Sequence, residues 1–169
     1  MSMHEHKTFS STQSVGCKVI VVSDTRNRET DENGRLLMEL LEKEEFSVVG
    51  YEIVKGNIRL VQEAIQSGCE NPAIDVVLTK GGTGIARYDV TYEAVSGLLE
   101  KELVGFGELF RMISYEEIGS GAMMSRALAG TIGRKAVFSI PGSRNAINLA
   151  MKKLILPELK HIVWDLHRQ

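Results

Sequence analysis

The sequence contains few cysteines and no run of apolar residues long enough to cross a membrane. Two of its 169 residues are cysteine, Cys17 and Cys69, and neither belongs to a Cys-x-x-Cys pair or lies at a metal-binding spacing from a histidine. We therefore predict that both are buried or half-buried thiols. No apolar stretch approaches the roughly 20 residues of a membrane span, and the polar N-terminus lacks the apolar core of a signal peptide. These absences predict a cytoplasmic protein with no membrane partner.

A surplus of positive charge and a histidine cluster are also missing. The 20 Lys and Arg residues are outnumbered by 22 Asp and Glu residues, which gives a formal net charge of -2. Because nucleic-acid binding needs an excess of Lys and Arg, we expect no nucleic-acid partner. His4 and His6 lie in the polar N-terminal stretch, whereas His161 and His167 are six residues apart, which is not the spacing of two ligands on one helix face.

Two well-known phosphate-binding patterns are absent as well. The sequence has no GxxxxGK[ST] segment, so it is not a P-loop nucleoside triphosphatase. The segment from Gly82 to Arg87 begins like the dinucleotide-binding pattern GxGxxG, but it has arginine where the third small residue belongs. This departure argues against a nicotinamide-dependent dehydrogenase.

The composition that remains is ordinary for a globular protein, with 43% hydrophobic and 25% charged residues. This is enough chain for one sizeable core, and no repeat, linker or low-complexity tract divides it. We predict a flexible tail over residues 1–16 and a single domain over residues 17–169. Short apolar runs alternate with helical patterns, which predicts right-handed crossovers and a three-layer α/β/α domain with a mostly parallel sheet.

The expected elements follow the periodicity of the apolar residues. An apparent hairpin, Arg126–Ile140, turns at Gly133-Arg134 and would add one antiparallel strand. The expected strands are Cys17–Ser23, Ser47–Val54 and Ile74–Thr79. The expected helices are Asp31–Glu45, Ile58–Ser67, Thr91–Lys101, Phe106–Ile118, Asn145–Leu156, which would end before Pro157, and Glu158–His167.

Three loops should meet at the carboxyl edge of this sheet, where open parallel sheets bind their ligands. They are Ser23-Asp24-Thr25-Arg26, the segment Gly81–Asp89, and Pro141-Gly142-Ser143. All three contain donors suited to an anion. Two of them open a helix, so two phosphate sites are expected, as for a nucleotide and a phosphorylated small molecule.

The loop LTKGGTGIARYDVTYEAV, residues 78–95, carries most of the expected chemistry. Glycines let backbone N–H groups approach a ligand, and successive N–H groups form an anion-binding nest. Lys80 and Arg87 would add positive charge and Thr83 a hydroxyl. Asp89 would repel a phosphate, so we interpret it as a ligand of Mg²⁺ held between carboxylate and phosphate oxygens. The alternative is that Asp89 or Thr91 only caps the following helix.

The other candidates have equally ordinary alternatives. Ser143 or Asn145 fits a helix N-cap, and Ser23-Asp24 fits a turn. Arg126 would face either the same crevice or the solvent. Glu108 stands in Gly105-Phe106-Gly107-Glu108, where glycines flanking an aromatic residue suggest close approach to another group.

Five segments together carry a resemblance: VVSDTR, LTKGGTGIARYDVTYEAV, GFGELFR, SRALAG and SIPGS. From about Lys18 to His167 the chain resembles the MoaB/MogA family of molybdenum-cofactor biosynthesis proteins, and bacterial MoaB most. The resemblance implies that Mg²⁺ and ATP are used to adenylylate the terminal phosphate of molybdopterin, with release of pyrophosphate. It also implies a homotrimer or homohexamer and an association with other proteins of the pathway.

The resemblance assigns roles to residues of this chain. Asp89 matches the catalytic, metal-holding aspartate. The residues implied for phosphate or nucleotide are Gly81, Gly82, Thr83, Gly84, Pro141, Gly142 and Ser143. The residues implied for molybdopterin are Ser23, Asp24, Glu108 and Ser125.

One position departs from the family pattern. Competent relatives carry an acid after the second strand, where this chain has Gly56 and Asn57. The departure favours a second hypothesis, a molybdopterin carrier or scaffold without efficient catalysis. If the acid is simply missing, Gly56→Asp should raise transfer.

Overall fold

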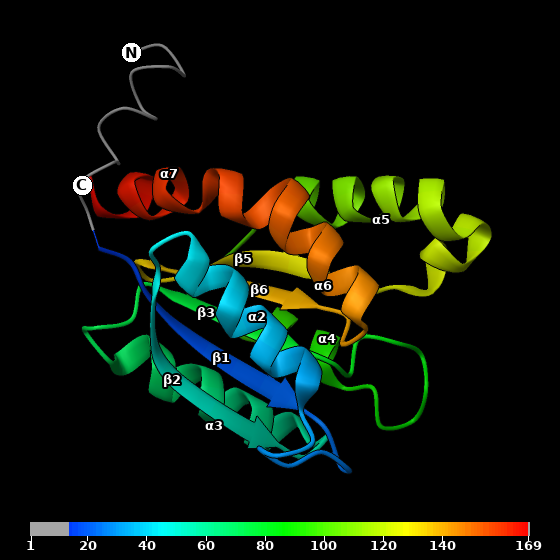
Figure 1. Ribbon diagram of the computed structural model, residues 1–169. Helices are drawn as coiled ribbons and strands as arrows, with labels where there is room; N and C mark the ends of the chain where they lie inside the picture. Colours follow the sequence, from blue (N-terminus) through cyan, green and yellow to red (C-terminus); the bar gives the residue numbers. More distant parts are fainter. Residues whose placement is uncertain (1–13, 169) are drawn as a thin grey trace.

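The structure is a computed structural model that describes residues 14–168 (Figure 1). Most of the predicted tail, residues 1–16, and with it His4 and His6, therefore lies outside the described residues. Val15 is already buried and Gly16 is the first residue of a strand. The packed domain thus begins slightly before the predicted boundary at residue 17.

The sheet has six strands in the order β2-β1-β3-β6-β5-β4. Four neighbours, β2, β1, β3 and β6, are parallel, and β5 runs antiparallel to both β6 and β4. This confirms a mostly parallel sheet with one antiparallel strand. The strands are β1 (Gly16–Val22), β2 (Ser47–Val54), β3 (Val76–Lys80), β4 (Lys101–Glu102), β5 (Leu128–Ile132) and β6 (Lys135–Ile140).

Helices cover both faces of the sheet, as predicted (Figure 1). Helices α2, α5, α6 and α7 pack on one face, and α3 and α4 on the other. Their bounds are α2 (Glu32–Lys43), α3 (Ile58–Glu70), α4 (Thr91–Ser96), α5 (Val104–Ile118), the 3₁₀ helix η2 (Gly119–Met124), α6 (Arg144–Ala150), the π-helical segment η3 (Met151–Ile155) and α7 (Leu156–His167).

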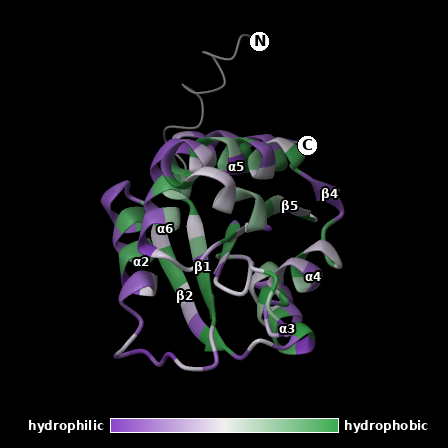
Figure 2. Cartoon of the chain, turned by 90° about the vertical axis from the view of Figure 1, so that its right-hand side faces the viewer, coloured by the Kyte–Doolittle hydropathy of each residue, from purple (hydrophilic) through white to green (hydrophobic). Residues whose placement is uncertain are grey.

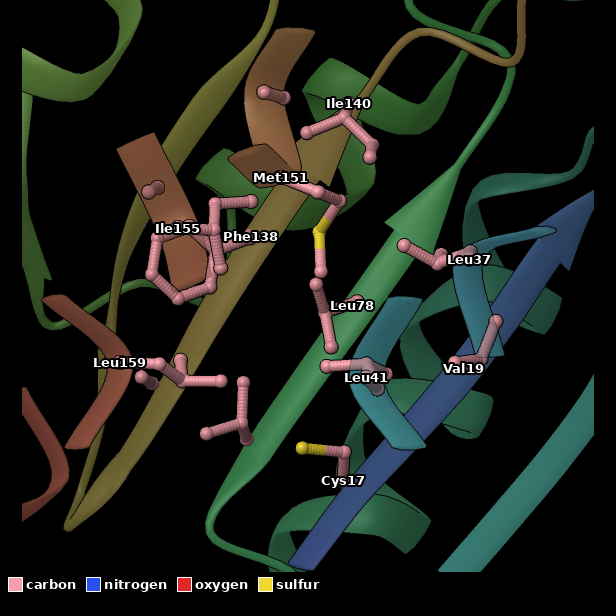
Figure 3. Close-up of a cluster of buried hydrophobic side chains, with 14 of the residues drawn as sticks. Cys17, Val19, Leu37, Leu41, Leu78, Phe138, Ile140, Met151, Ile155 and Leu159 are labelled. Carbon is pink, nitrogen blue, oxygen red and sulfur yellow. The ribbon is translucent and has the colours of Figure 1, made fainter. Parts of the chain in front are cut away.

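The larger hydrophobic core lies between the sheet and the four-helix layer. Leu78 and Phe138 from the sheet meet Leu41, Met151 and Leu159 from the helices (Figure 3). Each such side chain contributes about 1.5–3 kcal/mol when it is fully buried. This core is therefore the main support of the strands that end at the carboxyl edge.

Both cysteines are free thiols, and their environments confirm the prediction. Cys17 is fully buried in the larger core (Figure 3), and burial raises the pKa of its thiol to about 12. Cys69 is half-buried, and its pKa is also raised by burial. Neither thiol is suited to nucleophilic chemistry at neutral pH.

The helix expected at Thr91–Lys101 is wrong in its second half. Helix α4 ends at Ser96, and Lys101 and Glu102 form strand β4. Lys101 pairs with Thr131 at the edge of the sheet. Pairing between segments distant in sequence has overridden the local helical pattern.

The helix break expected before Pro157 is also wrong. The chain is helical from Arg144 through His167, because η3 joins α6 directly to α7. The N–H of Leu156 donates to the carbonyl of Met151, five residues back. Pro157 then lies in the first turn of α7, where a missing N–H costs little.

In the described part of the chain, no helix combines the length and apolar character needed to span a membrane. His161 contacts Glu158, and His167 contacts Asp75. The two histidines therefore serve different partners, in agreement with their spacing.

Candidate functional site

Strands β1, β3 and β6 end side by side, which brings the three predicted loops together. Val21 of β1 is level with Lys80 of β3, and Lys80 is level with Ile140 of β6. The backbone of Gly81 donates to the carbonyl of Ile140 at 3.0 Å. Figure 2 views the molecule from the side toward which the parallel strands point in Figure 1, and the loops there are mostly hydrophilic or neutral.

The turn after β3 requires glycine at two successive positions. Gly81 and Gly82 have φ angles of +92° and +67°, a region that residues with a Cβ rarely adopt. A Cβ on Gly81 would lie 2.6 Å from the carbonyl oxygen of Val22, and one on Gly82 would lie 2.3 Å from Oγ1 of Thr91. Thr91 fastens the turn, because its Oγ1 donates to the Gly81 carbonyl and its N–H to the Gly82 carbonyl.

Four successive peptide N–H groups of this loop lack an acceptor among residues 14–168. They belong to Gly82, Thr83, Gly84 and Ile85. The carbonyls of Thr83 and Gly84 accept from the backbone and side chain of Arg126, at 3.0 Å and 2.9 Å. A run of unpaired N–H groups that begins at the second of two positive-φ residues is the geometry of an anion nest.

Asp89 stands at the end of this loop, and the capping alternative for it is wrong. Its Oδ2 accepts from the N–H of Ala86 at 2.9 Å. The N-cap of α4 is Val90, which makes no side-chain hydrogen bond with the helix. Asp89 is half-buried, and within the described chain its Oδ1 has no hydrogen-bond partner, so one oxygen is available to a ligand.

A polar pocket of about 230 Å³ opens beside the glycine turn, between the first and last loops. Ser23 shapes one wall, because its Oγ accepts from the N–H groups of Thr25 and Arg26. Nδ2 of Asn33 donates to the Gly142 carbonyl at 2.8 Å and so ties α2 to the last loop. The lining includes Ser23, Arg26, Asp31, Asn33, Lys80 and Gly142.

A mostly apolar pocket of about 190 Å³ lies on the other side of the Pro141-Gly142-Ser143 loop. Ser125 Oγ is buried there with no hydrogen-bond partner in residues 14–168. Ser143 caps α6 by accepting from the N–H of Ala146, so its N-cap role is confirmed. The lining includes Phe110, Glu117, Ile118, Ser125, Pro141 and Ser143.

Asp24 occupies the space beside Gly56, where the resemblance leads us to expect an acid. Its Oδ1 accepts from the Gly56 N–H at 3.3 Å. A Cβ on Gly56 would lie 3.3 Å from the other oxygen of Asp24 and 2.8 Å from the carbonyl oxygen of Tyr88. Asn57 caps α3, since its side chain accepts from the Leu60 N–H at 3.2 Å. The carboxylate at this place is therefore supplied by the first loop.

Two residues proposed from the sequence lie elsewhere or have another partner. Glu108 is exposed on α5 and lines neither of the two pockets. Lys80 is buried in an ion pair with Asp31 at 2.6 Å. Its charge is therefore not available to a phosphate, contrary to the expectation from the sequence. Arg87 is exposed.

Arg26 belongs to the first predicted loop, whereas Asn33 and Glu117 were not predicted from the sequence as site residues. Arg26 and Asn33 line the polar pocket. Glu117 borders the apolar pocket, and its Oε2 accepts from Nδ2 of Asn145 at 2.6 Å. A local signal existed for Glu117, because it follows Phe110 and Ser114 at helical spacing on α5.

The donor set at this edge fits Mg²⁺ held jointly with a substrate. No group of three His, Cys, Asp or Glu side chains in the described residues converges to hold a metal alone. Mg²⁺ is usually bound through one or two carboxylates plus phosphate oxygens. Asp89, with a free oxygen beside the nest, and Asp24, near Tyr88, provide such carboxylates.

The fold and this site define a class of protein. Residues 18–161 match the model of a family described as a probable molybdopterin binding domain. Over 170 aligned positions the chain is 59% identical to molybdenum cofactor biosynthesis protein B of Bacillus cereus, with 100% of both chains covered. It is 52% identical to the Bacillus subtilis protein of the same name, with 99% of each chain covered.

Solved structures agree with the sequence comparison. A crystal structure of molybdenum cofactor biosynthesis protein B superposes with a TM-score of 0.91 at 61% identity, covering 93% of this chain and 98% of that one. The tungsten cofactor synthesizing protein MoaB of Pyrococcus furiosus has a TM-score of 0.78 at 38% identity, covering 92% and 99%. The chain belongs to the MoaB family of molybdenum cofactor biosynthesis proteins.

Proposed function

We propose that this protein adenylylates molybdopterin with Mg²⁺ and ATP. The observation that carries this proposal is the run of four unpaired N–H groups from Gly82 to Ile85. The next N–H, that of Ala86, donates to Asp89, whose other oxygen has no partner among the described residues. Such a nest is suited to the phosphate chain of a nucleotide. Asp89 beside it can hold the metal that accompanies those phosphates.

The two pockets suit the two substrates. The polar pocket, with Arg26 and the Ser23 turn, is suited to charged and hydrogen-bonding groups. The apolar pocket, with the unpaired hydroxyl of Ser125, is suited to a flat heteroaromatic ring with polar edges. The loop Pro141-Gly142-Ser143 separates them, so the ring and the phosphates of bound ligands would be held on its two sides.

The chemistry is transfer of an adenylyl group. A phosphate oxygen of molybdopterin attacks the α-phosphorus of ATP, the bond from that phosphorus to the β-phosphate bridging oxygen breaks, and pyrophosphate leaves. Positioning and charge neutralisation should supply most of the rate acceleration. Mg²⁺, when bound, would neutralise phosphate charge; the N–H groups would orient the phosphates, and Asp89 would hold the metal.

The alternative is a molybdopterin carrier that does not catalyse transfer. It is favoured by Gly56, which leaves the second loop without the acid expected there. Asp24 weakens that argument, because its carboxylate occupies the same place.

The deciding experiment is incubation of the purified protein with molybdopterin, ATP and Mg²⁺. Formation of adenylyl-molybdopterin with equimolar pyrophosphate supports the transferase. Tight molybdopterin binding with no adenylylated product, in the presence of Mg²⁺ and ATP, supports the carrier. Omission of Mg²⁺ is the matched control, and transfer that is unaffected by its removal would contradict a role for Asp89 as a metal ligand.

A further inference from the structure

Arg126 is the residue that connects the nest to the rest of the domain. It follows η2 and precedes β5, and its side chain reaches back 42 residues to Gly84. Its backbone N–H donates to the Thr83 carbonyl at 3.0 Å and its Nε to the Gly84 carbonyl at 2.9 Å. Its Nη2 donates to the Asp89 carbonyl at 2.8 Å. One residue therefore holds both ends of the segment from Thr83 to Asp89.

The guanidinium of Arg126 has little capacity left for a phosphate. Nη1 and Nη2 both pair with the carboxylate of Glu93, and Nη2 lies 3.2 Å from Oε2. The ring of Tyr92 lies 5.2 Å from the guanidinium carbon. Four of the five guanidinium N–H groups thus have acceptors within the protein, and the positive charge is balanced by Glu93.

The contacts of Arg126 determine which way the loop amides point. A trans peptide places the carbonyl of one residue opposite the N–H of the next. Because Arg126 holds the carbonyls of Thr83 and Gly84, the N–H groups of Gly84 and Ile85 are directed away from it. Thr91 does the same for the carbonyls of Gly81 and Gly82. Four consecutive carbonyls are therefore held by these two residues, and the four N–H groups of the same peptides are left unpaired among the described residues.

We propose that Arg126 is a positioning residue that preorganises the anion nest and Asp89, and that it does not bind phosphate itself. This rests on the proposed function only in taking ATP as the anionic ligand. A loop preorganised by charge-assisted hydrogen bonds binds without first losing conformational entropy. The loss of Arg126 should therefore weaken ATP binding without removing any group that touches ATP.

The first test compares Arg126→Ala with Arg168→Ala by calorimetric titration with ATP. Arg168 is a matched control, because it also pairs with a carboxylate, Asp165, and stacks on an aromatic ring, Trp164, but it lies at the end of α7. We expect Arg126→Ala to weaken ATP binding by about tenfold to a hundredfold, and Arg168→Ala to leave it unchanged. Low-millimolar guanidinium should restore much of the affinity of Arg126→Ala, whereas methylammonium should not. ATP affinity unchanged in Arg126→Ala would overturn the proposal.

The second test distinguishes a positioning role of Arg126 from direct binding of phosphate by Arg126. It removes the charge of the exposed Glu93 carboxylate. In Glu93→Gln the Arg126 guanidinium loses its counter-charge. If Arg126 were a phosphate ligand, ATP would bind more tightly to this variant. A positioning role predicts weaker ATP binding, because the Arg126 side chain is held less firmly against the loop. Equal or tighter ATP binding would refute that role.

Hydrogen exchange gives a readout that does not depend on ATP. The N–H groups of Ala86, Asp89 and Thr91 are hydrogen-bonded within the loop that Arg126 holds. They should exchange faster in Arg126→Ala, while the core of β1 and β3 keeps its protection. Unchanged exchange at these amides would refute the claim that Arg126 preorganises the loop. If the unaltered protein binds ATP yet forms no adenylyl-molybdopterin, the proposed transfer fails while the Arg126 proposal is still decided by these tests.

Discussion

Lys80 Nζ lies 2.6 Å from Oδ1 of Asp31, and both side chains are almost fully buried, at 6% and 1% exposure. Asp31 also accepts from the Tyr51 hydroxyl at 2.7 Å and, as the N-cap of α2, from the Gly34 N–H at 3.1 Å. The pair therefore joins the start of α2 to the last residue of β3. Gly81, the first residue of the nest turn, follows directly.

Removing one member of this pair should cost far more than removing both. Lys80→Met leaves a buried carboxylate without its cation, which typically costs about 3–5 kcal/mol. The double variant Lys80→Met/Asp31→Asn removes both charges and should be less destabilised than Lys80→Met alone. Urea unfolding of the four proteins of this cycle measures the difference. If the loss of unfolding free energy in the double variant equals the sum of the losses in Lys80→Met and Asp31→Asn, the two residues do not interact.

The same pair predicts how stability depends on pH. Burial raises the pKa of Asp31, but hydrogen bonds from Lys80, Tyr51 and Gly34 outweigh burial and leave that pKa below its ordinary value of 3.8. A lowered carboxyl pKa contributes stability above the unfolded value and loses it as the pH falls through the folded value. The unfolding free energy of the unaltered protein should therefore exceed that of Asp31→Asn at neutral pH. The gap should shrink as the pH falls into the range where the unfolded carboxyl, with its pKa near 3.8, takes up a proton. A gap that shrinks already near neutral pH would contradict this.

Much of the fold could be predicted from the sequence because its signals are local. The alternation of Val- and Ile-rich runs with helical patterns predicts the layers, and the level ends of β1, β3 and β6 follow from a parallel sheet. The errors at Thr91–Lys101 and Pro157 have tertiary causes, namely pairing with β5 and a π-helical segment. No local pattern records either one.

The site was predictable only in part, for the same reason. Glycines at 81 and 82 announce a turn by themselves, and Asp89 is conspicuous beside them. The partner of Lys80 lies 49 residues away and that of Arg126 lies 33 to 42 residues away. The sequence therefore showed charges near a phosphate loop but not that these charges are already neutralised within the protein.

Asp89→Asn should slow adenylyl transfer strongly while leaving the loop in place. Asparagine keeps an oxygen that can accept from the Ala86 N–H, but it loses the charge that holds a metal. Such a defect typically lowers the rate by about 10²–10³. Initial rates of adenylyl-molybdopterin formation measure it, with thermal unfolding as the control for the fold. Transfer at the unaltered rate would reduce Asp89 to a loop-closing residue.

The outer face of α5 predicts self-association. Phe106 and Phe110 point into the core, whereas Met112, Tyr115 and Ile118 are 55–63% exposed. A cluster of large apolar side chains in solvent marks an interface, and we expect copies of this chain to cover it in at least a trimer. Sedimentation equilibrium at micromolar concentration should show this, and Met112→Glu should lower the assembly state. A single 18.7 kDa species for the unaltered protein would contradict it.

The structure reverses the expectation for Gly56→Asp that followed from the resemblance. Gly56 is not one of the described glycines that have a positive φ angle, so backbone strain does not oppose the substitution. The obstacle is lack of space. A Cβ at position 56 would lie 2.8 Å from the carbonyl oxygen of Tyr88, the residue before Asp89, and 3.3 Å from a carboxylate oxygen of Asp24. Aspartate there would displace the Tyr88 backbone and place two carboxylates side by side.

We therefore expect Gly56→Asp to lower both stability and transfer, with Gly56→Ala as the matched control for the space occupied by a Cβ alone. The alanine variant should show the loss caused by shifting Tyr88. The aspartate variant should lose more at low Mg²⁺, and high Mg²⁺ should recover only the part due to repulsion from Asp24. Initial rates across a Mg²⁺ titration, together with thermal unfolding, separate these two effects. If Gly56→Asp transfers faster than the unaltered protein at any Mg²⁺ concentration, then Asp24 does not stand in for the missing acid.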